Sequence, residues 1–224
     1  MLKGILFDFN GTLYDDTRFH IAAWMRYFHE EFGLDFSREE TRRRFIGPDN
    51  EMIFRDVFGD DITEDQIIAW SSGKERIYRS LAADAPDLIE GAPEMFDALV
   101  QRGIPFALAT SSRIDNVRFY LDTLRLNRWF TMDRVVYIDG SIAAKPNPAF
   151  YTEAARRIGL KPAECIVAED SCSGIQGAVN AGAGRIIAID RTLGAKRLVE
   201  MRDVYASVHD FVQFMRYIPQ LQNL

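Results

Sequence analysis

Four polar clusters in this sequence each follow a short apolar run, and their residue types point to chemistry. The clusters are Asp8 with Asn10, Thr110 to Ser112, Lys145, and Glu169 with Asp170. Short apolar runs of this kind predict buried parallel strands, and ligands of open parallel sheets bind beyond the carboxyl ends of the strands. The sequence therefore predicts that carboxylates, an ammonium group and hydroxyl groups gather in one crevice.

These groups together match a phosphate site that also holds a divalent cation. Carboxylate oxygens are ligands for Mg²⁺, and hydroxyls, backbone amides and a lysine suit phosphate oxygens. Asp8 carries most weight because it ends the apolar run Gly4 to Phe7, where a charge persists only beside cations or hydrogen-bond donors. Each cluster alone is a weak signal, since lone lysines are usually solvated and serine clusters usually cap helices.

The composition is that of an ordinary globular protein and narrows the classes of partner. The chain has 224 residues, 47% hydrophobic and 27% charged, enough for one large domain or a domain with an insertion. The net charge is -6, and no block of like charge exceeds Arg42 to Arg44, so neither nucleic acid nor an anionic membrane is expected as a partner.

The location is inferred from targeting signals and cysteines. The early apolar stretch stops at Asp8, far short of the ~20 residues of a membrane span, and no basic leader with a cleavage site precedes it. We therefore expect a cytoplasmic protein. Cys165 and Cys172 are the two cysteines, and they are expected to be free thiols rather than a metal site.

Strand-like and helix-like segments alternate along most of the chain. The predicted strands are Gly4 to Phe7, Pro105 to Ala109, Arg134 to Ile138, Cys165 to Ala168 and Arg185 to Ile189. The predicted helices between them are Ala92 to Gln101, Asn147 to Ile158 and Ser173 to Ala181, each followed by a glycine. This alternation predicts an α/β fold, with a Rossmann-like parallel sheet core and helices on both faces.

One segment interrupts the alternation and reads as successive helices. Capping-box patterns begin at Ser37 and Thr63, and Gly33 and Gly59 stand where helices are expected to end. We predict an inserted α-helical cap domain at residues 15–84 and a catalytic core at 1–14 and 85–224. The alternative is a helical bundle that only stabilises the core.

The four clusters resemble, in order, the motifs of the haloacid dehalogenase superfamily, in particular its beta-phosphoglucomutase-like and phosphoglycolate phosphatase-like subfamily. The matching segments are Asp8-Phe9-Asn10-Gly11-Thr12-Leu13, Ala109-Thr110-Ser111-Ser112, Lys145-Pro146-Asn147-Pro148, and Glu169-Asp170-Ser171 with Gly174-Ile175 and Ala181-Gly182. The match spans nearly the whole chain. It implies that Asp8 is a nucleophile that forms an aspartyl-phosphate and that the helical insertion is a mobile cap.

The resemblance also implies a role for each site residue. Asp8, Asn10 and Lys145 are the expected catalytic residues. Mg²⁺ is the expected cofactor, held by Asp8, the backbone carbonyl of Asn10, Glu169 and Asp170. The expected phosphate-binding residues are Gly11, Thr110, Ser111 and Lys145. Gly11 permits the turn that brings the backbone close to the phosphate.

Asn10 departs from the family pattern. Phosphatases of the family usually carry aspartate there, as the general acid and base. An amide does not exchange a proton near neutral pH, so an acid-base contribution of ~10²- to 10⁴-fold is expected to be missing or supplied elsewhere. Hydrolysis of the aspartyl-phosphate is the step most affected. Three interpretations remain: a slow phosphatase in which water, His20 or the substrate carries the proton, an introduced change that stalls turnover, or a binder without turnover.

The insertion and the second motif supply the candidate substrate residues. These are His20, Asn50, Lys74, Ser112 and Arg113. The loop Gly47 to Glu51 matches a specificity loop that carries an arginine in the mutase, but here no arginine follows before Arg55. Losing one cation weakens a second phosphate site, which favours a monophosphate hydrolase over a mutase.

The sequence thus predicts a Mg²⁺-dependent phosphatase that hydrolyses a small phosphorylated metabolite, a sugar phosphate or similar, with activity reduced by Asn10. The alternatives are a beta-phosphoglucomutase-type sugar phosphomutase and a catalytically impaired phosphometabolite-binding protein. The expected state is a monomer or weak dimer.

Overall fold

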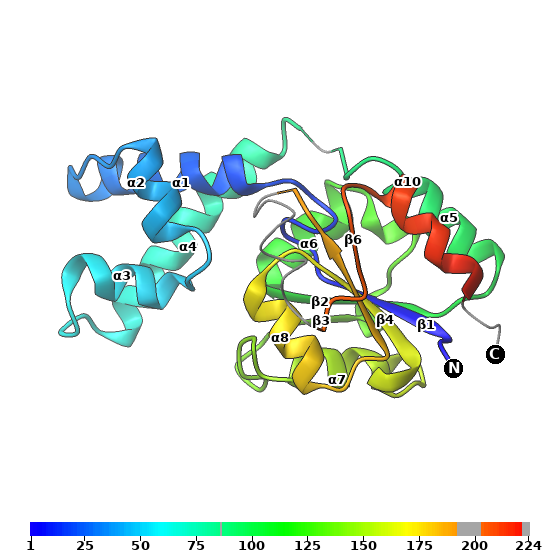
Figure 1. Cartoon of the computed structure of the whole chain (residues 1–224). Helices are drawn as coiled ribbons and strands as arrows, with labels where there is room; N and C mark the ends of the chain where they lie inside the picture. Colours follow the sequence, from blue (N-terminus) through cyan, green and yellow to red (C-terminus); the bar gives the residue numbers. More distant parts are fainter. Residues whose placement is uncertain (86, 192–202, 221–224) are drawn as a thin grey trace. The chain divides into compact units, whose positions relative to one another are not determined.

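The apolar runs form the strands of one parallel sheet, in a computed structural model that describes residues 1–85, 87–191 and 203–220. Within those residues the sheet has six strands in the order β3-β2-β1-β4-β5-β6 (Figure 1). They are β1 (Gly4–Phe7), β2 (Phe106–Arg113), β3 (Val135–Ile138), β4 (Cys165–Glu169), β5 (Arg185–Ile189) and β6 (Ala206–Val208). Because β1 pairs with both β2 and β4, Asp8 emerges from the middle of the sheet.

The five predicted strands are present, with one correction. β2 continues to Arg113, so Thr110, Ser111 and Ser112 belong to the end of the strand rather than to a loop after it. The pairing of β2 with β3 shifts register between Ala109 and Arg113, and this irregularity lets a polar segment remain in the strand. β6 was not predicted, because three residues carry too little pattern.

Alternate residues of β1 face opposite layers of helices, which confirms the predicted fold class. Leu6 belongs to a buried cluster with Tyr151 of α7 (Ala149–Arg157) and Ile175 of α8 (Cys172–Asn180). On the other face, the ring of Phe7 lies 5.2 Å from Phe96 of α5 (Ala92–Gln101) and 6.1 Å from Phe211 of α10 (Phe211–Phe214). Helices therefore cover both faces, as expected for a parallel sheet.

The remaining elements around the sheet lie between its strands or follow β6. They are α5 (Ala92–Gln101), α6 (Ile114–Asp122), α10 (Phe211–Phe214) and the 3₁₀ helices Leu126–Arg128, Met132–Arg134, Pro162–Glu164 and Met215–Gln220. The bounds of α5 agree with the sequence-based prediction, and α7 and α8 differ from it by one or two residues at each end. The helix α6 was not predicted.

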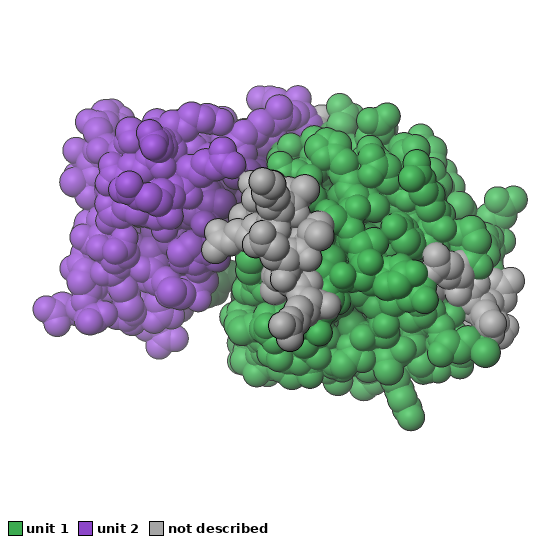
Figure 2. Space-filling model, in the orientation of Figure 1, with its two compact units in different colours: residues 1–15, 87–224 green, residues 16–86 purple. Residues whose placement is uncertain are grey.

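The chain divides into two units, residues 1–15 with 87–224 and residues 16–86, which Figure 2 shows in green and purple. The second unit consists of α1 (Thr17–Phe32), α2 (Arg38–Phe45), α3 (Asn50–Phe58) and α4 (Glu64–Ala82). Its core is aromatic and includes Trp24, Phe28 and Phe54. The assignment of these units as a catalytic core and a cap stays a prediction.

Local signals explain the helix ends of the second unit. Thr63 and Gln66 form a full capping box at the start of α4, whereas Ser37 at α2 only accepts a hydrogen bond from the backbone of Glu40. Gly33 ends α1 in the left-handed conformation that glycine adopts without steric cost.

Two further expectations concern thiols and membranes. Cys165 and Cys172 are both free thiols, the first buried and the second partly exposed. Among the described residues, none of the helices has the length and apolar character needed to cross a membrane.

Candidate active site

A lysine and two carboxylates form the centre of the site. The ammonium Nζ of Lys145 donates to Oδ1 of Asp8 at 2.6 Å and to Oε1 of Glu169 at 2.8 Å. The three side chains are at most 10% exposed. Lys145 and Asp8, which are 137 positions apart in sequence, thus meet at the carboxyl ends of β1 and β4. This is the edge of the sheet where the sequence predicted that they gather.

Glu169 is held on all sides by hydrogen bonds. Besides Lys145, its Oε1 accepts from the hydroxyl of Tyr151 at 2.9 Å. Its Oε2 accepts from the backbone N–H of Ser171 at 2.8 Å and from the Ser171 hydroxyl at 3.0 Å. Such a carboxylate is suited to hold Lys145 in place and to support a metal shell.

Asp170 and the turn after β1 complete the cluster. Thr12 donates its hydroxyl hydrogen to Oδ1 of Asp170 at 3.1 Å. Gly11 has a φ of 79°, and a Cβ there would overlap the carboxylate of Asp170. Glycine is therefore required twice at this position, for its backbone conformation and for the close approach of Asp170.

Three carboxylates share one lysine, so the cluster holds excess negative charge. Oxygens of Asp8, Glu169 and Asp170 lie within 4.8 Å of one another, a spacing that can hold a metal ion. Burial, and to a smaller extent the charge of Glu169, raise the pKa of Asp8, while Lys145 lowers it, and together they bring this pKa to about 7. Burial, followed by the charges of Glu169 and Asp8, raises the pKa of Asp170 well above its usual range, although Thr12 and Lys145 oppose this shift. A donor set of buried carboxylates with raised pKa values fits a hard divalent cation such as Mg²⁺.

The pKa of Lys145 moves in the direction that favours its charge. Burial alone would lower this pKa, but the carboxylates of Asp8 and Glu169 outweigh burial and raise it. Lys145 therefore remains an ammonium throughout the neutral range.

Asn10 lies in a second polar cluster at the end of β2. Its Oδ1 accepts from the hydroxyl of Ser112 at 2.9 Å and from that of Thr110 at 3.4 Å. Its Nδ2 donates to the hydroxyl of Tyr120 at 3.0 Å. The side chain of Asn10, from the turn after β1, is thus hydrogen-bonded directly to side chains at the end of β2.

Three of the predicted substrate residues meet within the helical unit. Nζ of Lys74 lies 2.8 Å from Nδ1 of His20 and 2.8 Å from Oε1 of Glu75, which also accepts from Asn50 at 3.1 Å. Because an ammonium only donates, Nδ1 of His20 accepts, and its Nε2–H faces Oδ2 of Asp16 at 3.4 Å. Both ring nitrogens of His20 are therefore engaged inside this unit.

Two predicted residues stay outside these clusters, and two participants were missed. Ser111 and Arg113 are exposed, and neither side chain is hydrogen-bonded to another residue that the structure describes. Tyr120 and Tyr151 were not predicted to take part. Their signal was a hydroxyl on a largely apolar helix face, because a buried tyrosine usually finds a hydrogen-bond partner.

Comparisons with known proteins identify the family. The family model described as haloacid dehalogenase-like hydrolase matches residues 5–188. The chain belongs to the haloacid dehalogenase-like hydrolases. This confirms the resemblance that the motifs indicated.

Relatives of this hydrolase include phosphatases and a mutase. It is 28% identical over 204 residues, 89% of this chain and 91% of the relative, to a phosphorylated carbohydrates phosphatase of Thermotoga maritima. It is 26% identical to the beta-phosphoglucomutase of Bacillus subtilis over 81% of this chain and 80% of that protein. A crystal structure of a family IA, variant 3 hydrolase from Entamoeba histolytica matches with a TM-score of 0.89, 30% identity and 95% of each chain covered.

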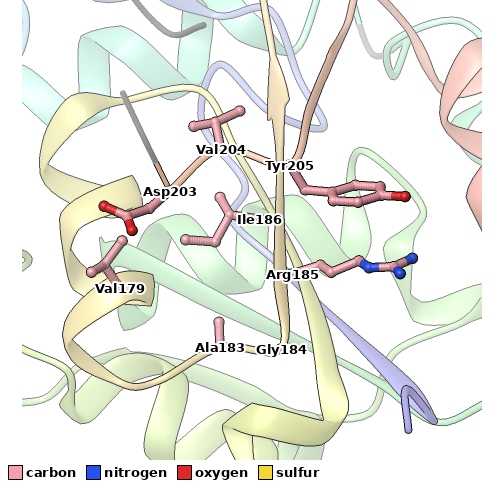
Figure 3. Close-up of a pocket in the computed structure, with 8 residues that line it drawn as sticks. All are labelled: Val179, Ala183, Gly184, Arg185, Ile186, Asp203, Val204 and Tyr205. Carbon is pink, nitrogen blue, oxygen red and sulfur yellow. The ribbon is translucent and has the colours of Figure 1, made fainter. Parts of the chain in front are cut away.

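The hydrolase also has a cavity that is separate from the carboxylate cluster. Its volume is about 530 Å³. It is lined by Val179, Ala183, Gly184, Arg185, Ile186, Asp203, Val204 and Tyr205 (Figure 3). The guanidinium of Arg185 lies 4.1 Å from the centre of the Tyr205 ring. Arg185 begins β5, so the cavity lies at the amino end of that strand, whereas Asp170 follows the carboxyl end of β4.

We predict that Mg²⁺ stabilises the folded hydrolase and removes the fall in its stability with pH that Asp8 causes. The folded-state pKa of Asp8 is raised from 3.8 to about 7, so between these values the folded protein binds more protons than the unfolded chain and stability falls as pH rises. In EDTA the Tm should therefore be higher at pH 6 than at pH 8. Adding Mg²⁺ at pH 8 should raise the Tm by at least ~2 °C, the shift that roughly 1 kcal/mol gives at this size. An Asp170→Asn variant that responds equally to Mg²⁺ would contradict this.

Two glycines of α8 provide a matched test of how closely the Glu169 carboxylate is packed. A Cβ at Gly174 would overlap the Glu169 carboxylate, whereas a Cβ at Gly177 would meet the carbonyl oxygen of Asn147 at an ordinary 3.5 Å. We expect Gly174→Ala to destabilise the protein by ~1–3 kcal/mol, because Glu169 must move. Gly177→Ala should be neutral or stabilising by up to ~1 kcal/mol, since alanine is the better helix former. Urea unfolding of both variants measures the difference, and equal effects would show that Glu169 is not closely held.

Proposed function

We propose that this hydrolase is a Mg²⁺-dependent phosphatase that hydrolyses a small phosphorylated metabolite, such as a sugar phosphate, through an aspartyl-phosphate on Asp8. The observation that carries this proposal is the buried Asp8 carboxylate, 2.6 Å from Lys145 and grouped with Glu169 and Asp170. The phosphatases among its relatives support the same class of substrate.

Asp8 is the proposed nucleophile. One carboxylate oxygen forms a bond to phosphorus while the bond from phosphorus to the leaving oxygen breaks. Asp8, the backbone carbonyl of Asn10 and Asp170 would hold Mg²⁺, with Glu169 behind them. When bound, Mg²⁺ supplies charge that neutralises both the carboxylate and the phosphoryl oxygens.

Fixed donors around Asp8 are proposed to receive the phosphoryl group. Lys145 keeps its positive charge beside Asp8, and Glu169 fixes the direction of its ammonium. The hydroxyl of Thr110 and the backbone amide of Ser111 would donate to the phosphoryl oxygens. Gly11, whose own N–H donates to the carbonyl of Tyr14 at 2.8 Å, would let the backbone approach them closely. Donors that are already in place need no reorganisation as negative charge develops.

Position 10 limits the rate in this proposal. The leaving oxygen must gain a proton in the first step, and the attacking water must lose one in the second. Asn10 supplies neither, so the leaving group and solvent carry these protons. We expect hydrolysis of the aspartyl-phosphate to be slow, so that phosphorylated Asp8 accumulates during turnover.

Substrate choice is proposed to rest on His20, Asn50, Lys74, Ser112 and Arg113. A hydrolase is favoured over a mutase because the first arginine after Gly47 is occupied locally. Arg55 donates to the backbone carbonyl of Asp60 at 3.0 Å and to Oε1 of Glu51 at 2.9 Å. A cation that is already engaged by its own helix and by the segment directly after it is a poor candidate for a second phosphate.

A phosphate-release screen tests the proposal. Sugar phosphates and other monophosphates are incubated with the protein in Mg²⁺ and in EDTA, beside an Asp8→Asn variant. We expect release that needs both Mg²⁺ and Asp8. Isomerisation that depends on a sugar bisphosphate, without net release, would identify a mutase. Binding of substrates without turnover would identify a binding protein.

A further inference from the structure

Asn10, Ser112 and Tyr120 form a closed ring of hydrogen bonds next to the nucleophile. The distances are 3.0 Å from Asn10 Nδ2 to the Tyr120 hydroxyl, 2.8 Å between the hydroxyls of Tyr120 and Ser112, and 2.9 Å from Ser112 Oγ to Asn10 Oδ1. The three side chains come from the turn after β1, from α6 and from the end of β2. The ring therefore ties two of the family motifs to a helix outside them.

Counting protons shows that the three bonds must all run in the same sense around the ring. The amide oxygen of Asn10 only accepts, so Ser112 spends its single hydroxyl hydrogen on that bond. Tyr120 must then donate to Ser112, while its oxygen accepts from the amide of Asn10. Each member donates once and accepts once within the ring. Turning the amide over reverses all three bonds and closes the ring equally well.

The fold holds Tyr120 rigidly in this ring. Its side chain is fully buried, and its ring stacks on Phe9 with centroids 3.9 Å apart. Thr110, also fully buried, accepts from the backbone N–H of Ser112 at 3.1 Å and donates to Asn10 at 3.4 Å. Packing on one side and backbone bonding on the other leave the two hydroxyls little freedom.

An ionised aspartate would not close this ring. A carboxylate has no hydrogen to give to Tyr120, so both Ser112 and Tyr120 would have to donate to it. The contact between their two hydroxyls would then lack a hydrogen. Both carboxylate oxygens would be occupied by protein hydroxyls rather than by water.

We propose that Ser112 and Tyr120 are positioning residues that adapt position 10 to an amide. They hold Asn10 in a ring in which each side chain donates one hydrogen bond and accepts one. They would also donate to both oxygens of an ionised aspartate at this position. This inference rests on the proposed phosphatase function. If the proposal holds, Ser112 and Tyr120 match the asparagine at position 10. The change Asn10→Asp alone would then not create a working general acid and base.

Four proteins test the proposal by phosphate release from p-nitrophenyl phosphate in Mg²⁺: the native chain, Asn10→Asp, Tyr120→Phe and the double variant. In the native background, Asn10→Asp should raise turnover by less than about threefold, because both of its oxygens are engaged. In the Tyr120→Phe background one oxygen is released, and the same change should raise turnover by at least about tenfold. A Ser112→Ala background opens the other corner of the ring and replaces Tyr120→Phe if that variant does not fold. Equal gains in both backgrounds would overturn the proposal.

A measurement without turnover separates this proposal from the proposed function. In NMR spectra of ¹⁵N-labelled protein, the Asn10 side-chain amide is assigned by its loss in Asn10→Asp. Its protons should exchange with water at least about tenfold faster in Tyr120→Phe than in the native chain. Tyr205→Phe, the same change at an exposed residue directly before β6, should leave this exchange unaltered. Unaltered exchange in Tyr120→Phe would overturn the ring, whereas faster exchange with no phosphate release from any protein would overturn only the phosphatase.

Discussion

Replacing Asp8 by asparagine is expected to lower phosphate release by at least about 10³-fold, because an amide cannot attack phosphorus at a useful rate. The change keeps the size of the side chain and its place after β1. The acid-quenched protein should also lose the phosphate that becomes covalently bound to native protein during turnover. Rates with and without the substitution, measured at saturating Mg²⁺, check this result.

The fold of the Asp8→Asn variant should survive, and this makes the test specific. Asp8 is buried beside Glu169 and Asp170, and like charges at this spacing repel. Removing one of the three carboxylates should leave the Tm in EDTA at pH 8 equal to or above that of the native chain. Activity within tenfold of native, in a folded variant, would show that another residue is the nucleophile.

Replacing Lys145 by methionine is expected to have the second large effect, on stability and rate together. The lysine pairs with both Asp8 and Glu169 and is 5% exposed. Its loss leaves buried carboxylates without their ammonium, which typically costs ~3–5 kcal/mol. Phosphate release should fall by at least about 10²-fold, because a fixed positive charge beside the reacting oxygens is gone. Urea unfolding in EDTA and phosphate-release assays measure the two effects.

A surface lysine of the same unit supplies the control. Lys3 pairs with Glu164 at 2.8 Å, like the buried pairs of Lys145, but both side chains are about 30% exposed. Lys3→Met should change the free energy of unfolding by no more than ~1 kcal/mol and leave phosphate release unchanged. Adding Glu169→Gln to Lys145→Met should restore part of the lost stability. Equal losses in the free energy of unfolding for Lys3→Met and Lys145→Met would contradict the role of Lys145 in stabilising the buried carboxylates.

Much of the fold could be predicted because the sheet is buried on both faces. Strands such as Gly4–Phe7 and Cys165–Glu169 are short apolar runs that stop at a polar residue, and parallel strands read this way. The helix Ile114–Asp122 escaped prediction although Val117, Tyr120 and Leu121 of one face are buried. Its segment begins directly after the polar end of β2, so no apolar run separated strand from helix.

The sequence by itself determined the identity of the chemical groups and the edge of the sheet where they gather. Asp8, Lys145, Glu169 and Asp170 could be placed together because parallel strands carry their carboxyl ends to one edge. Which hydroxyl meets which carboxylate or amide was decided only in three dimensions. Tyr151 reaches Glu169 and Tyr120 reaches Asn10 because α7 and α6 pack against β2 and β3 of the sheet, and this packing depends on contacts between residues far apart in the chain.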